Sequence, residues 1–247
     1  MKHWPVWSVP VTCALAFAVL WGLDANRAAF SVLNRLGTSE VLWANITILG
    51  DTVVAFALCL PLWRRRPDLL WAFVFVALLG TLWVHGLKPL FDMPRPPAVL
   101  PDVQVIGPAY KAHTFPSGHA TTAFAIGGLY ALGFQQFRTR YAIILSVALV
   151  AALSRAVVGV HWPLDILAGA FGGWLAAAAG IHLGAKTLGF GAKPWVQWLI
   201  ALFLAACALW LVIGHAKSGY PQADLFQRAI GICCLAAAGA RLKRAAA

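Results

Sequence analysis

Acidic side chains are scarce in this sequence. Aspartate and glutamate together number 8 among 247 residues, against 19 lysines and arginines, and Glu40 is the sole glutamate. Charged residues of both signs amount to 11% of the chain, whereas soluble globular domains have about 25%. This composition excludes an ordinary soluble domain, and it makes any acid inside an apolar run or beside a motif informative.

Cysteine gives no indication of a covalent or metal-bound framework. The five cysteines lie within apolar stretches, and none has a partner at the spacing of metal ligands. An odd number of cysteines in lipid surroundings argues against disulfides. We expect small buried hydrophobic residues at Cys13, Cys59, Cys207, Cys233 and Cys234.

Apolar residues supply most of the chain: 61% are hydrophobic, and the mean hydropathy is +0.78. A transmembrane helix needs roughly 20 such residues in a row. The apolar runs therefore predict an all-α, polytopic transmembrane bundle that takes up residues 1–247 as a single domain. Its eight expected spans are residues 5–23, 41–63, 69–87, 117–137, 141–158, 162–183, 195–214 and 225–241.

The positions of lysine and arginine give the expected orientation. Most of them, including the run Arg64-Arg65-Arg66, are cytoplasmic if both termini are cytoplasmic and residues 5–23 form a retained span. A cleaved signal peptide is the alternative for that first run. The net charge of +11 then reflects membrane topology, and we expect no nucleic-acid partner. With this orientation, residues 88–116 and 155–165 emerge together on the outer side.

The first segment suited to chemistry contains Lys88 and Arg95, seven positions apart among several prolines. Proline fixes φ and blocks helix continuation, so a rigid loop would present the two cations. The planar fork of arginine suits phosphate oxygens, and lysine acts as a point charge. Taken alone, the pair could simply contact lipid headgroups.

The second segment is Ser117-Gly118-His119, directly before an apolar run. Serine is a natural N-cap, and glycine lets a ligand approach the backbone closely. The start of the helix would then bind an anion, and His119 could give a proton to a leaving oxygen. Taken alone, an ordinary capped helix with an interfacial histidine explains this segment equally well.

The third segment contains Arg155, His161 and Asp165. Pro163 suits the first turn of a helix, and this puts Asp165 within reach of His161. A carboxylate on one ring nitrogen fixes the tautomer and leaves the other nitrogen free to attack. A cation at a span end is costly unless it faces a polar cavity or a ligand, which makes Arg155 a candidate. Taken alone, the histidine and the acid could merely hold the start of the helix.

Together the segments bring two histidines, one orienting acid, three cations and a helix-start anion site to one membrane face. Phosphoryl transfer requires this combination of charge stabilisation, a nucleophile and an acid. Three cations would offset the charge of a phosphate without a metal. A single further acid, Asp92, makes a poor Mg²⁺ site, so we expect neither a metal nor another cofactor.

The blocks 88–96, 116–119 and 154–165 resemble the three signature blocks of the type 2 phosphatidic acid phosphatase (PAP2) family. The resemblance implies a core of six helices within about residues 41–183, with residues 195–241 as two additional spans. It also implies a metal-independent phosphatase in a bacterial inner membrane, with its site facing the periplasm.

The same resemblance implies a role for each motif residue. His161 would attack phosphorus and form a phosphohistidine, Asp165 would orient it, and His119 would protonate the leaving lipid. The phosphate would be held by Lys88, Arg95, Ser117, Gly118 and Arg155.

The expected substrate is a lipid phosphate or diphosphate in the outer leaflet, with undecaprenyl diphosphate as the first choice. Phosphatidylglycerophosphate, phosphatidic acid and lipid A phosphate stay open, as does transfer of the phosphoryl group to a second lipid. A vanadate haloperoxidase conflicts with eight spans and no soluble domain, and a transporter with a vestigial site conflicts with the complete motifs. The bilayer and the lipid are the expected partners, and no obligate protein partner is evident.

Other ionisable residues have two explanations each. Asp51 stands in the middle of the expected span 41–63, where acids are costly and often functional, but a protonated acid bonded to a neighbouring helix fits as well. His85 could support the site from one turn before Lys88, although an interfacial packing histidine is the simpler explanation. His113 and Lys111 could touch a headgroup or be solvated loop residues.

Overall fold

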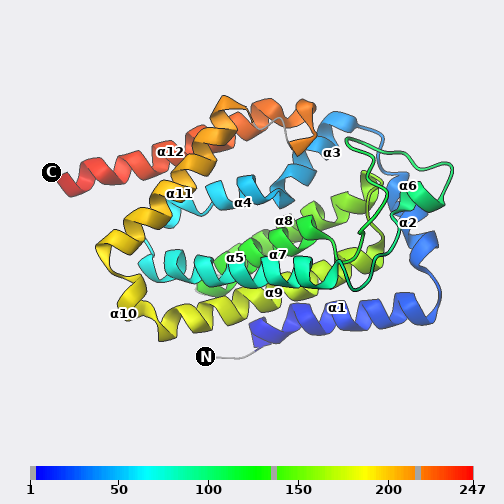
Figure 1. Cartoon of the computed structure of the whole chain (residues 1–247), viewed down its shortest axis with the longest axis horizontal. Helices are drawn as coiled ribbons and strands as arrows, with labels where there is room; N and C mark the ends of the chain where they lie inside the picture. Colours follow the sequence, from blue (N-terminus) through cyan, green and yellow to red (C-terminus); the bar gives the residue numbers. More distant parts are fainter. Residues whose placement is uncertain (1–3, 135–137, 215–217, 247) are drawn as a thin grey trace.

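Helices form all of the regular structure in the computed structural model, which describes residues 4–134, 138–214 and 218–246. The long helices run side by side along the longest axis of the molecule (Figure 1). The centre of the bundle is formed by α5 (Pro67–Leu87), α7 (Gly118–Gly133) and α9 (Pro163–Lys186). The predicted all-α fold class is confirmed.

Five described segments are long and apolar enough to cross a membrane. Three of them lie in α5, α9 and α8 (Arg138–Val157). The other two lie in α11 (Pro194–Ile213) and in α12 (Asp224–Ala246), which the 3-10 helix η4 (Pro221–Ala223) precedes. Their positions agree within a few residues with five of the expected spans, and the predicted membrane bundle is confirmed.

Two further expected spans belong to pairs of helices joined by a bend. The helix α1 (Trp4–Gly22) is followed by α2 (Asn26–Asn34), which turns through 108° and was not expected from the sequence. The region of expected span 41–63 is divided by a bend of 59°. If each bent pair counts as one span, the total is seven. The pieces on the two sides of the second bend are α3 (Glu40–Thr47) with η1 (Ile48–Gly50), and α4 (Thr52–Ala57) with η2 (Leu60–Leu62).

The second bend lies at Asp51, so the prediction of an unbroken helix over 41–63 is wrong. The Asp51 backbone is extended, and its Oδ1 accepts hydrogen bonds from Val53 N at 2.8 Å and Val54 N at 3.2 Å. The carboxylate therefore caps α4, as aspartate commonly does at a helix start. Gly50 packs against α7 here, because an added Cβ would lie 2.8 Å from the backbone oxygen of His119.

The helix α7 is shorter than its neighbours. It has 16 residues and is about 24 Å long, against a hydrocarbon core of about 30 Å. The expected span was residues 117–137, of which 135–137 lie outside the described residues. Because α7 packs against α5, α8 and α9, it lies inside the bundle and has less need to match the thickness of the bilayer.

The cysteine prediction is correct at three positions and wrong at two. All five cysteines are free, and Cys13, Cys59 and Cys234 are buried. Cys207 is half-buried and Cys233 is exposed. These two lie on α11 and α12, where about one third of each span is buried inside the protein, so part of each helix faces outward.

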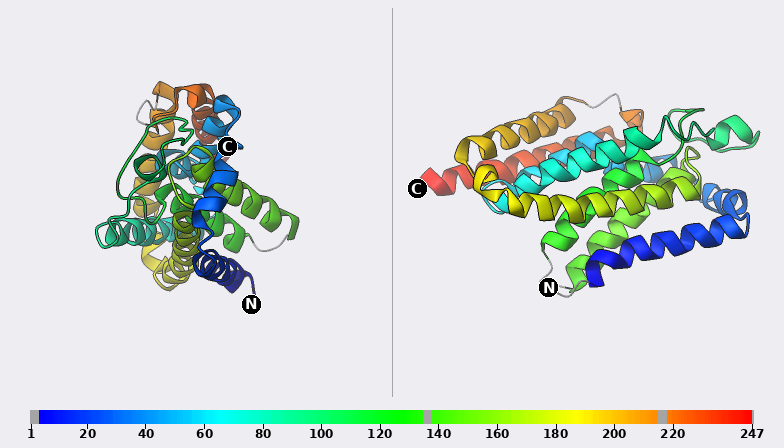
Figure 2. Two further views of the ribbon diagram at one scale, coloured as in Figure 1. Left: turned by 90° about the vertical axis from the view of Figure 1, so that its right-hand side faces the viewer. Right: turned by 60° about the horizontal axis from the view of Figure 1, so that its bottom comes forward.

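The connections carrying the three motif segments meet at one end of the bundle, on the right of Figure 1. The connection between α5 and α7 lies across this end, as the end-on view in Figure 2 shows. Ile106 N in that connection donates to Val158 O at 3.1 Å, and Arg95 Nη1 donates to Val160 O at 2.9 Å. The fold therefore joins residues 88–117 directly to residues 158–162.

Close packing of α9 against α7 fixes the relative position of the second and third segments. A Cβ added to Gly173 would lie 2.2 Å from Thr121 O, and one added to Gly169 would lie 2.6 Å from Ser117 O. Small residues permit this approach between membrane helices. As a result Ser117 N donates to Asp165 O at 3.0 Å.

This packing predicts that Gly173→Ala destabilises the protein, because the new methyl group meets a backbone carbonyl that cannot rotate away. We expect the apparent Tm of the detergent-purified protein to fall by about 5 °C, measured by thermal unfolding. The control is Gly86→Ala in α5, where nothing lies within 4 Å of an added Cβ. Equal Tm values for the two variants would contradict the close contact.

Candidate active site

His161 lies at the centre of the site, in the short connection between α8 and α9. It is 2% exposed, and its two ring nitrogens face different partners. Nδ1 lies 3.3 Å from Asp165 Oδ2, and Nε2 lies 3.1 Å from Arg95 Nη1. Arginine can only donate, so Nε2 carries the lone pair and Nδ1 carries the proton. The structure thus defines the tautomer whose lone pair is on Nε2, where it accepts from Arg95.

Asp165 is positioned by the first turn of α9. Its Oδ2 accepts from Trp162 N at 2.8 Å, so the carboxylate reaches back over the start of its own helix. Pro163 occupies the first helical position, where no backbone donor is needed. The spacing that suggested a contact between His161 and Asp165 therefore corresponds to a contact in the structure, and the roles of the two residues stay predictions.

Thr114 joins this pair and was missed in the sequence. Its hydroxyl donates to Asp165 Oδ2 and lies 3.2 Å from His161 Nδ1, from which it accepts. The side chain is fully buried. A threonine in an irregular loop does not by itself indicate a functional residue. Its position three residues before Ser117 was the one feature of the sequence that could have indicated a place near the site.

The two other cations of the first and third segments act on His161 through their charges and have polar partners of their own. Lys88 Nζ donates to His113 O at 3.1 Å. Arg155 is 3% exposed, and its Nη1 donates to Thr47 Oγ1 at 2.7 Å and to Tyr220 OH at 2.9 Å. Neither hydroxyl was expected from the sequence, because Thr47 lies in α3 and Tyr220 lies just before η4.

Burial and mutual repulsion act on these charges. Burial, followed by the charge of Arg155, lowers the pKa of Arg95 to about 10. Burial and the charge of Arg95 also lower the pKa of Lys88. For His161, burial and the charges of Arg95, Arg155 and Lys88 lower the pKa well below 6.5. The ring is therefore neutral at pH 7, and the site has an electrostatic preference for an anion.

The second segment forms the start of α7. Ser117 Oγ accepts from Ala120 N at 3.4 Å, so the serine is the N-cap. Gly118 and His119 line a cavity of about 150 Å³ between α4, α5 and α7, together with His85 and apolar side chains such as Val84 and Phe56. The structure thus brings the predicted acid to the edge of a cavity whose remaining walls are largely apolar.

Some residues considered from the sequence take other places. Asp92 lies 3.0 Å from His113 Nδ1, and both side chains are exposed. Asp51 caps α4, which neither of its two expected explanations included. Among the described residues, no group of three or more His, Cys, Asp or Glu side chains could hold a metal ion.

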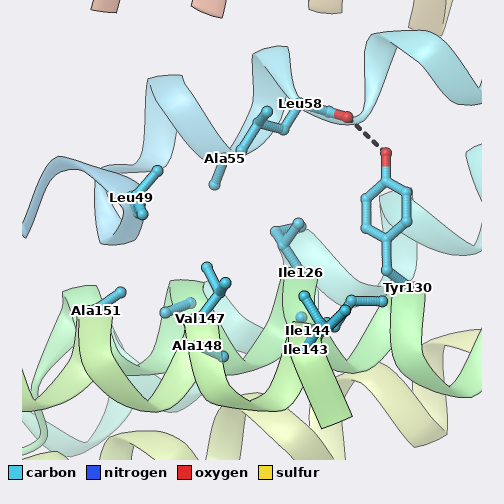
Figure 3. A pocket seen from close by; sticks show the side chains of 12 residues that line it. Leu49, Ala55, Leu58, Ile126, Tyr130, Ile143, Ile144, Val147, Ala148 and Ala151 are labelled. Carbon is cyan, nitrogen blue, oxygen red and sulfur yellow. Dashed lines mark hydrogen bonds between the residues drawn. The ribbon is translucent and has the colours of Figure 1, made fainter. Parts of the chain in front are cut away.

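A larger apolar pocket of about 290 Å³ lies between α4, α7 and α8 (Figure 3). It is lined by side chains such as Leu49, Ile126 and Val147, and Tyr130 OH donates to Leu58 O at 2.5 Å across it. None of the motif residues lines this pocket. Although it is larger than the cavity beside His119, it is therefore not the candidate active site.

Comparisons with known proteins identify relatives of this chain. The family model described as the PAP2 superfamily matches residues 68–188, which include all three segments. The putative undecaprenyl-diphosphatase YbjG of Escherichia coli is 30% identical over 167 residues, covering 62% of this chain and 79% of that protein. The lipid A 1-phosphatase of Rhizobium etli is 39% identical over 69 residues, and this match covers only 28% of its length and 28% of the chain.

Two solved structures have a similar fold. The crystal structure of Aquifex aeolicus LpxE has a TM-score of 0.58 and 28% identity, covering 64% of this chain and 94% of that one. A transmembrane PAP2-type phosphatidylglycerolphosphate phosphatase from Bacillus subtilis has a TM-score of 0.51 and 22% identity, covering 72% and 96%. The fold and the site together define the class of membrane-embedded lipid phosphatases. More specifically, the chain belongs to the PAP2 superfamily.

The position of Thr114 predicts that its hydroxyl supports the reaction. Thr114→Val keeps the shape but leaves Asp165 and His161 each short of one hydrogen bond. We expect kcat/KM for phosphate release to fall about tenfold, a typical effect of losing a hydrogen bond to a charged group. Thr114→Ser keeps the hydroxyl and should retain most of the activity. Wild-type kcat/KM in the valine variant would exclude this role.

The charges around His161 predict a pH effect. The neutral ring is the reactive form, and removing a nearby cation raises the pKa of His161 toward its ordinary value. In Lys88→Met, the acid limb of the kcat/KM profile should therefore move to higher pH than in the wild type. Lys111→Met removes an exposed cation from the same loop and should leave that limb in place. An acid limb that moves to lower pH in Lys88→Met would contradict the expected rise in the pKa of His161.

Proposed function

We propose that this protein hydrolyses a lipid phosphate or diphosphate without a metal, through a phosphohistidine at His161. The observation that carries the proposal is the environment of His161 Nε2. This nitrogen carries a lone pair, its ring is held from the other side by Asp165, and it faces Arg95 within a cluster of cations. An anionic phosphate attracted by those cations would arrive in front of the nucleophile.

The proposed reaction has two steps. Nε2 attacks phosphorus and the bond from phosphorus to the lipid oxygen breaks. His119 gives that oxygen a proton, which it holds once the bound phosphate offsets the charges of Arg155, Arg95 and Lys88. Asp165 stabilises the positive charge that develops on the ring of His161. The phosphoryl oxygens are held by Lys88, Arg95, Arg155, Ser117 and the Gly118 amide.

The second step releases phosphate. His119, now neutral, takes a proton from water, and the resulting oxygen attacks phosphorus. The bond between phosphorus and Nε2 breaks, and His161 returns to its starting state. If a second lipid replaced water, the same intermediate would give a phosphotransferase, and analysis of the products separates these two outcomes.

The cavity beside His119 supports an amphiphilic substrate. It shares Phe56, Ala77 and Thr81 with an open apolar groove of about 430 Å³ along α5 and α11. A headgroup at His119 could therefore continue into a hydrocarbon chain that leaves between these helices. A water-soluble phosphate ester has no hydrocarbon chain that could occupy this groove.

Undecaprenyl diphosphate is our first choice of substrate, because the relative matched over 79% of its length carries that specificity in its name. Lipid A 1-phosphate is the second, on the basis of a match that is higher in identity and much shorter. We further propose that the protein resides in a bacterial inner membrane with cytoplasmic termini. The site would then face the periplasm, where phosphatidylglycerophosphate and phosphatidic acid are further candidates.

The test is phosphate release by the detergent-purified protein in the presence of EDTA. We expect release from at least one of undecaprenyl diphosphate, lipid A, phosphatidylglycerophosphate and phosphatidic acid. His161→Ala and Arg155→Ala should abolish it, and Asp165→Asn should lower it by several orders of magnitude, because the carboxylate holds the reactive tautomer.

Two results would count against the proposal. Full activity of His161→Ala would exclude the phosphohistidine, and loss of wild-type activity in EDTA would exclude a metal-independent reaction. The ranking of the four lipids decides the substrate class, and phosphate appearing on an added acceptor lipid would favour the transferase.

A further inference from the structure

The segment 218–220, between α11 and η4, reaches the candidate active site, although it lies outside residues 68–188 that match the family model. Its Tyr220 is 2% exposed, and its hydroxyl accepts from Arg155 Nη1 at 2.9 Å. The guanidinium carbon lies 6.0 Å from the centre of the Tyr220 ring. The phenol of Tyr220, from the connection between the last two long helices α11 and α12, therefore contacts Arg155, a predicted phosphate ligand.

A second hydroxyl comes from a residue that precedes the matched region in the sequence. Thr47, the last residue of α3, is fully buried, and its Oγ1 accepts from the same Nη1 at 2.7 Å. Because η1 and the break at Asp51 follow it, Thr47 belongs to the bent span. Two segments outside the matched region thus bind one nitrogen of Arg155.

These two hydrogen bonds leave one edge of the Arg155 guanidinium available to bind a further group. Nη1 already carries two hydrogen bonds, whereas Nε is buried and has no hydrogen-bond partner among the described residues. Nε and Nη2 point along the same edge of the planar group, and two parallel donors of this kind match two oxygens of a phosphate. A buried donor without a partner is costly, and a bound anion would remove that cost.

Tyr220 is held firmly in this position. Its ring packs on Gly107, where an added Cβ would lie 2.5 Å from a ring carbon, and Gly107 has a φ of +86° that favours glycine. Gly219 packs on Pro108 in the same way. The following η4 is tied to α3 by a hydrogen bond of 3.3 Å from Gln222 to Glu40. The segment 219–223 is therefore packed against the connection between α5 and α7 and bonded to α3, the helix that carries Thr47.

We propose that Tyr220 and Thr47 are positioning residues that hold Arg155 with its Nε edge toward the substrate phosphate. This inference rests on the proposed function, because it assigns Arg155 to the phosphate. The C-terminal helical pair is then required for phosphate binding as well as for membrane anchoring.

The test compares variants that remove one hydroxyl at a time. Tyr220→Phe and Thr47→Val should each weaken competitive inhibition by inorganic phosphate about tenfold and lower kcat/KM by at least the same factor. Thr47→Ser restores the hydroxyl and should return both values close to those of the wild type. A role in stability alone would lower the Tm and leave the phosphate inhibition constant of the folded enzyme unchanged.

The matched control is Tyr130→Phe. Tyr130 also loses a hydroxyl that donates to a partner, the backbone oxygen of Leu58, but this contact lies in the apolar pocket of Figure 3. We expect its phosphate inhibition constant and kcat/KM to match those of the wild type, with the Tm recorded for every variant.

The outcomes separate this inference from the proposed function. A wild type that releases phosphate, with Tyr220→Phe and Thr47→Val both unchanged in phosphate inhibition, would overturn the inference alone. A wild type without turnover would fail the proposed function, and direct calorimetry of inorganic phosphate binding then decides the inference. Weaker binding in the two variants supports it, whereas equal binding, or no binding by the wild type, overturns it.

Discussion

A buried excess of positive charge governs this site. Arg95 and Arg155 are buried beside Lys88, and Asp165 is the one buried carboxylate among the described residues. Like charges held together in this way destabilise a fold unless something offsets them. Here the offset comes largely from backbone carbonyls, since Arg95 donates to the oxygens of residues 112 and 160, and Lys88 donates to that of residue 113. Carbonyl dipoles orient a cation without cancelling its charge, so the field remains available for an anionic ligand.

The same field prepares the nucleophile. Cations that attract a phosphate also disfavour a proton on His161, and its neutral form is the one that can attack. Arg95 connects the two effects, because its guanidinium contacts Nε2, the atom that would attack phosphorus. One carboxylate, Asp165, is sufficient on the opposite side of the ring. A second acid would have paired with a cation and weakened both effects, which agrees with the scarcity of acids in the sequence.

The fold class and the motif segments could be predicted because their signals are local. Apolar runs mark helices, and the four-residue spacing between His161 and Asp165 allows a contact at the start of α9. Thr47 and Tyr220 could not be predicted, because they contact Arg155 across 108 and 65 positions. The break at Asp51 was also missed, since its apolar flanks resemble those of a continuous span. Hydropathy records which residues avoid water, and it does not record which hydroxyl faces which guanidinium.

The broken span gives a physical reason for an acid in the middle of an apolar run. A continuous helix would have no free amides at Val53 and Val54, and Asp51 satisfies these donors where the helix restarts. The break ends the first part near Thr47, beside Arg155, and leaves Gly50 against the backbone of His119. One interruption therefore contacts both the predicted acid and a predicted phosphate ligand. Helix continuity is lost at a single point, and the site gains support from a helix that carries none of the three motifs.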